Sequence, residues 1–124
     1  MVCATITRDP AVVDDTLAVR IRDSLHRAIV KVVKVKPEDV EVRVRDVSPL
    51  DLNSGKLAIE IDSGPGKELW RIEECRPILL GLNEAVMADE VVPPDLCKKG
   101  ESNAWLRIYA RGASMPLGCP DMLH

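Results

Sequence analysis

The chain has 124 residues, of which 46% are hydrophobic and 30% are charged, and its formal net charge is −3. This length is enough for one domain with a single hydrophobic core. Two Trp, one Tyr and no Phe leave few rings on which bases could stack. Together with the slightly acidic charge, this argues against a nucleic-acid-binding platform.

The first ten residues, MVCATITRDP, lack the basic segment and apolar run of a signal peptide. No uncharged apolar stretch approaches the length of a membrane span, so we expect no membrane association. The four cysteines are Cys3, Cys75, Cys97 and Cys119, and no C-x-x-C pair occurs. We therefore expect no metal or other cofactor, and reduced thiols as in a cytoplasmic protein.

The first part of the chain predicts a strand followed by a long helix. Residues 3–8, CATITR, are short and rich in β-branched side chains, which is typical of a strand. Asp9 and Pro10 resemble a helix cap and a first helical residue, so we expect a helix from near Pro10 to before Pro37. Its apolar face comprises Leu17, Ile21, Leu25, Ala28, Ile29 and Val32.

After Pro37 the apolar repeat changes from three or four residues to two. Val40, Val42 and Val44 alternate with charged residues, which predicts a strand with one dry face and one charged face. Residues 56–62, KLAIEID, predict a third strand.

The second half repeats this layout. The turn Gly64-Pro65-Gly66 leads into a second helix, in which we expect Pro77 to cause a kink or a break. The apolar face of that helix comprises Leu69, Ile72, Cys75, Leu79, Leu82 and Val86. Residues 104–112, AWLRIYARG, predict a fourth strand, and residues 113–124 show no period and are expected to form an irregular tail.

Two tandem β-α-β units predict an α/β (α+β) domain over residues 1–112, with a four-stranded mixed sheet and both helices on one face. The other face would carry a set of polar and charged residues: Thr5, Thr7, Glu41, Arg43, Arg45, Glu60, Asp62 and Arg107. Trp105 and Tyr109 share the parity of Arg107. Large rings on an open face favour coverage by other subunits.

The phrase VKVKPEDVEVRV (33–44), within a tandem β-α-β chain, resembles the tautomerase superfamily, particularly its macrophage migration inhibitory factor and 5-carboxymethyl-2-hydroxymuconate isomerase groups. The resemblance covers roughly residues 2–111. It implies a homotrimer whose sheets face inward around a shared axis, and an isomerase or tautomerase acting on small 2-oxo acids.

The chemistry implied by the resemblance depends on an amino-terminal proline that acts as a base once the initiator methionine is removed. Here Met1 is followed by Val2, and Glu41 stands where shorter tautomerases place a substrate-binding arginine. Lys36 matches a lysine near the family's active site. We therefore expect weak or absent enol–keto conversion, with a candidate pocket for a small anionic ligand at Val2, Lys36, Arg43 and Arg107.

Each of these cations has a simpler interpretation. Lys36 can be a solvated lysine at a helix end, and the sheet arginines can pair with Glu41, Glu60 and Asp62 across strands. His26 lies off the apolar face of the first helix and has no predicted partner.

Three function classes remain open: a tautomerase-like enzyme, a non-catalytic oligomer of the same fold, and a ferredoxin-like binding or regulatory module. Strand order separates the third from the others, because ferredoxin-like sheets interleave the two halves of the chain.

Overall fold

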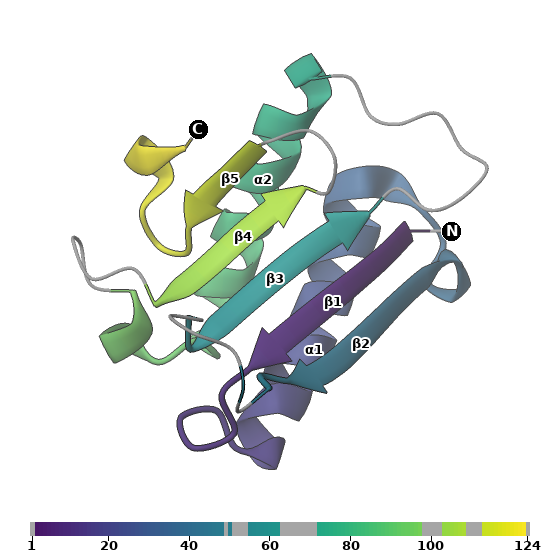
Figure 1. Ribbon diagram of the computed structural model, residues 1–124. Helices are drawn as coiled ribbons and strands as arrows, with labels where there is room; N and C mark the ends of the chain where they lie inside the picture. Colours follow the sequence, from purple (N-terminus) through teal and green to yellow (C-terminus); the bar gives the residue numbers. More distant parts are fainter. Residues whose placement is uncertain are drawn as a thin grey trace.

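A computed structural model shows a mixed five-stranded sheet with two helices packed on one face (Figure 1). The strands are β1 (Val2–Arg8), β2 (Val40–Asp46), β3 (Leu57–Asp62), β4 (Ala104–Ile108) and β5 (Ala113–Pro116). The long helices are α1 (Asp15–Ile29) and α2 (Ile72–Ala88). The structure describes residues 2–48, 50, 55–62, 72–97, 103–108 and 113–123. The predicted turn at residues 64–66, Leu69 and Tyr109 lie outside these ranges.

The strand order is β2-β1-β3-β4-β5. Within each half the two strands pair in parallel, β1 with β2 and β3 with β4, and the halves join through antiparallel β1 and β3. The halves therefore lie side by side, which excludes the interleaved ferredoxin-like order. The predicted class, two β-α-β units with both helices on one face, is confirmed (Figure 1).

The sheet has one strand more than predicted. β5 forms from residues expected to be irregular, and it pairs antiparallel with β4 through Leu106 and Met115. Met115 is fully buried. The strand was missed because it is only four residues long and ends in a proline, so it shows no alternation.

The helix α1 begins at Asp15, later than the predicted start near Pro10. The Asp9 carboxylate accepts a hydrogen bond from the Ala11 backbone N–H at 3.0 Å, which closes a turn. The helix cap is Asp14, whose Oδ1 accepts from Leu17 N at 2.8 Å. The helix then continues as a π-helical turn, η1 (Val30–Lys34), and ends before Pro37 as predicted.

The core lies between the helices and the sheet. The predicted apolar face of α1 is confirmed, since Ile21, Leu25 and Ile29 are fully buried. From α2 the buried residues are Cys75, Leu79, Leu82 and Val86. Pro77 lies within α2, but the helix is continuous from Ile72 to Ala88 and is not split.

The outer strand β2 is less buried than predicted. Along its inward side Val40 is buried and Val42 is half-buried, whereas Val44 is 36% exposed. The face of β2 that was predicted to be buried is therefore fully buried only at Val40. β2 is an edge strand of the sheet, as β5 is at the other side, so it has a neighbouring strand on one side only.

Gly81 of α2 packs directly against η1. A Cβ atom on this residue would lie 3.0 and 3.2 Å from Cγ1 and Cγ2 of Val32 in η1. Glycine therefore allows η1 and α2 to pack at this distance, and a larger side chain would force the valine or the helix to move.

Candidate functional site at the start of β1

Several elements meet at the end of the sheet where β1 begins, here called the Val2 end. Val2 pairs with Val40, so the start of β2 lies beside the start of β1. Cys3 pairs with Asp62, so β3 ends there as well (Figure 1). The segment from η1 through Lys36 into β2 reaches the same end, as does the N-terminal part of α2, which follows β3 in the chain.

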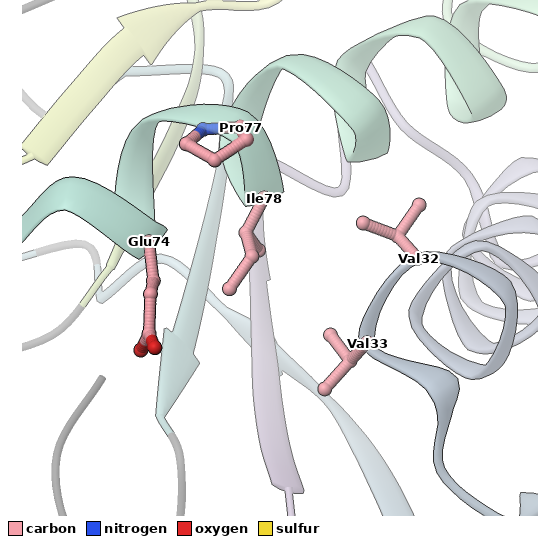
Figure 2. A pocket seen from close by; sticks show the side chains of 5 residues that line it. All are labelled: Val32, Val33, Glu74, Pro77 and Ile78. Atoms are coloured by element: carbon pink, nitrogen blue, oxygen red, sulfur yellow. The ribbon is translucent and has the colours of Figure 1, made fainter. Parts of the chain in front are cut away.

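A groove of about 410 Å³ separates η1 from the first turns of α2. Val32 and Val33 of η1 face Ile78 of α2 across it, and Pro77 and Glu74 complete the wall on the α2 side (Figure 2). Four of these five residues are apolar, so the groove suits an apolar group, with one carboxylate at its edge.

Three cations are candidates for binding a ligand: Lys36, Arg43 and Arg107. Of these, Lys36 lies at the Val2 end, because it precedes the start of β2. Its side chain is exposed, and its backbone caps the short helix η2 (Pro37–Asp39) before β2. His26 supports this turn, with Nε2 lying 3.0 Å from the Pro37 carbonyl oxygen. Within the described ranges the Lys36 ammonium makes no hydrogen bond or ion pair, so it is available to an anion.

The candidate arginines lie elsewhere, on the face of the sheet without helices. Arg43 Nε bonds Glu41 Oε1 at 2.8 Å, and Arg107 Nε lies 3.3 Å from Glu60 Oε2. Arg107 and Glu60 lie on neighbouring strands, so the predicted pairing across strands is confirmed there, whereas Arg43 pairs with Glu41 of its own strand. The hydrogen bond from Arg43 lowers the pKa of Glu41, and the same bond raises that of Arg43.

The structure divides the four candidate residues into two groups. Arg43, Thr5, Glu60 and Arg107 occupy one row across β2, β1, β3 and β4. Three strand spacings of about 4.8 Å place the two arginine backbones roughly 14 Å apart. The Val2 side chain faces the core and is 3% exposed. Within one chain, therefore, Val2 and Lys36 share an end of the sheet, while Arg43 and Arg107 belong to the open face.

Carboxylates surround the first residues of β1 on that open face. Cys3 lies between Glu41 on β2 and Asp62 on β3. The Cys3 Sγ is 3.9 Å from Glu41 Oε2 and is half-buried. Among the described residues no group of three or more His, Cys, Asp or Glu could hold a metal ion, and no described helix could cross a membrane.

No family model and no curated protein matches the sequence. Solved structures do match the fold. A native fused 4-OT is 15% identical with a TM-score of 0.55, over 86% of this chain and 84% of that chain. N1, a member of the cis-3-chloroacrylic acid dehalogenase family, is 14% identical with a TM-score of 0.54, over 86% and 72% of the two chains.

A third similar structure is a symmetric trimer of a fused 4-OT, 13% identical with a TM-score of 0.53, over 86% of this chain and 81% of that chain. These are structures of the tautomerase superfamily, so the resemblance predicted from the sequence is confirmed for the fold. The groove was not predicted. The sequence hints at the groove only through the adjacent valines Val32 and Val33. In a regular α-helix two adjacent residues do not face the same way, so one of these valines would point away from α2.

Proposed function

We propose that the protein is a homotrimer of the tautomerase fold that binds a small anionic ligand of the 2-oxo acid class at the Val2 end, with weak or absent enol–keto conversion. The observation that carries this proposal is the start of β1, where Val2 stands first and carboxylates flank the next residue on both sides.

The weak activity follows from the state of the N-terminal amine. If Met1 is removed, Val2 presents a primary amine without the ring of a proline. Glu41 and Asp62 flank Cys3, the residue that follows Val2. Their negative charges favour the protonated form of the Val2 amine. A protonated amine cannot remove a proton from a substrate, but it can bind a carboxylate.

Ligand binding is supported by features at the same end of the sheet. The exposed ammonium of Lys36 supplies a positive charge, and the groove between η1 and α2 supplies an apolar wall. A small acid with an apolar body, such as phenylpyruvate, has both complementary parts.

The trimer is supported by the face of the sheet without helices. In a single chain Arg107 is exposed there and Trp105 is only half-buried. Packing against other copies would cover this face, and the similar fused 4-OT forms a symmetric trimer.

Titration with phenylpyruvate tests the site. We expect saturable binding, weakened in Lys36→Ala but kept in the control Lys31→Ala, and slow turnover that disappears when the N-terminal amine is acetylated. Val2→Pro, in protein lacking Met1, should turn over faster. Rapid turnover that persists after acetylation, or binding that does not depend on Lys36, would refute the proposed site.

Light scattering tests the assembly. We expect a mass of about 41 kDa, three times the 13.7 kDa of the chain. Thr5→Arg, at the centre of the open face, should release monomers, whereas Glu84→Arg on the exposed side of α2 should not. A monomeric mass for the unmodified chain would exclude the trimer.

A further inference from the structure

Two cysteines from distant parts of the sequence come together at the end of the sheet opposite to Val2. Cys97 follows the short helix η3 (Pro94–Leu96), and Cys119 precedes the short helix η4 (Pro120–Met122). The Cys119 Sγ lies 3.9 Å from the carbonyl oxygen of Cys97. All four cysteines of the chain are free thiols in the structure.

The backbone on the Cys119 side lies directly against the Cys97 side chain. A Cβ atom on Gly118, the preceding residue, would be 3.2 Å from the Cys97 Cβ and 3.6 Å from its Sγ. A disulfide needs two Cβ atoms about 3.5–4.5 Å apart. The backbone next to Cys119 thus touches the Cys97 side chain, and side-chain rotation with movement of the turn would bring the two Cys Cβ atoms to that separation.

Both sides of this contact are held by hydrogen bonds. The Cys97 N–H donates to the Pro94 carbonyl at 3.0 Å. On the other side, the Gly118 N–H donates to Oδ1 of the buried Asn83 at 2.8 Å, and Gly118 adopts a φ of +80° that suits glycine. The approach of the two cysteines is thus part of the packed structure of the chain.

We propose that Cys97 and Cys119 form an intramolecular disulfide when the protein meets a peroxide. Cys97 is the half-buried partner and reacts first, whereas Cys119 is 7% exposed. The Cys97 thiolate attacks one oxygen of hydrogen peroxide and breaks the O–O bond, which gives a sulfenic acid and, after proton uptake, water. The Cys119 sulfur then displaces the hydroxyl group as a second water, so two electrons from the sulfurs reduce one peroxide.

The rate of this reaction depends on pH. Burial raises the pKa of the Cys97 thiol, and the neighbouring Cys119 raises it further. The thiolate is the reacting form, so it is scarce at neutral pH and increases as the pH rises. Disulfide formation should accelerate by about 10-fold or more between pH 7 and pH 9.

The experiment is peroxide treatment of the folded protein, followed by digestion with trypsin and mass spectrometry without reductant. Lys98, Lys99, Arg107 and Arg111 lie between the two cysteines, so cleavage leaves two peptides that only a disulfide can join. We expect this pair in the unmodified chain, lighter by two hydrogen atoms and separated by reductant. Pro77 prevents cleavage after Arg76, so the Cys97 peptide also contains Cys75. The pair should persist in Cys3→Ser and in Cys75→Ala and disappear in Cys97→Ser.

A second measurement follows the stability of the oxidised chain. The bond would close a loop of the chain from residue 97 to residue 119, which should raise the midpoint of thermal unfolding by roughly 5 °C or more. Four free thiols remaining after treatment at pH 9, a link that uses Cys3 or Cys75, or a linked dimer on a non-reducing gel would overturn the proposal.

Discussion

The two ends of β1 use positive charge in opposite ways. At the far end Arg8 is enclosed: its Nε bonds Asp46 Oδ1 at 2.9 Å, its Nη2 bonds Asp15 Oδ1 at 2.6 Å, and its Nη1 donates to the Val13 carbonyl at 3.2 Å. At the Val2 end, Lys36 is exposed to solvent. A cation with a complete set of partners joins elements of the fold, whereas an exposed cation leaves its charge facing solvent.

The Arg8 contacts link three parts of the fold. Asp46 ends β2, Asp15 begins α1, and Val13 belongs to the turn between β1 and α1. Only 11% of the Arg8 side chain is exposed. The hydrogen bonds to Asp46 and Asp15 raise the pKa of Arg8 above its ordinary value, so the guanidinium stays charged.

The largest effect should come from the core that both ends share. Leu25→Ala removes a fully buried side chain from the middle of α1 and should lower the free energy of unfolding by about 2–4 kcal/mol. His26→Ala, which loses one exposed hydrogen bond, should cost well under ~1 kcal/mol. Urea denaturation measures both free-energy changes. Equal losses for the two variants would mean that Leu25 does not face the core of the protein as the structure shows.

Arg8→Met should destabilise the protein less than Leu25→Ala but still measurably. It keeps an apolar stem and leaves Asp15 and Asp46 without their cation. Lys36→Met is the matched control at the other end and should leave the denaturation midpoint unchanged. If both methionine variants shift the midpoint equally, the contrast between the two ends is wrong.

The smallest effect concerns pH at the Arg8 end. The Ala11 N–H, and then Lys56, lower the pKa of Asp9 below its ordinary value. This carboxylate therefore stabilises the fold above about pH 4, the unfolded value, and loses that effect as the pH falls through its lowered folded pKa. The stability difference between the unmodified chain and Asp9→Asn should be present at pH 7 and vanish in acid. A difference that persists at pH 2 would exclude this cause.

The repeating pattern of apolar residues was sufficient to predict the helices and four strands. The spacing of Ile21, Leu25 and Ile29 reports burial directly, because one helix face meets the sheet. The start of α1 was wrong because Asp9 and Asp14 are both plausible caps, and in the structure Asp9 closes a turn and pairs with Lys56 while Asp14 caps the helix.

The candidate site was less predictable than the fold. Glu41 and Arg43 are two residues apart in one strand, so their pairing follows from strand geometry. The groove lies between Val32 and Val33 in one half of the chain and Glu74, Pro77 and Ile78 in the other. Periodicity describes each helix separately and contains no information about the gap between two helices.

The outer edge of β2 has a consequence for how the chain meets other molecules. An unpaired edge offers free N–H and C=O groups onto which a strand of another molecule can add, the first step of aggregation. Four charged residues line this strand: Glu41, Arg43, Arg45 and Asp46. Any strand that added there would have to accommodate these charges, so they oppose indiscriminate self-association of the chain.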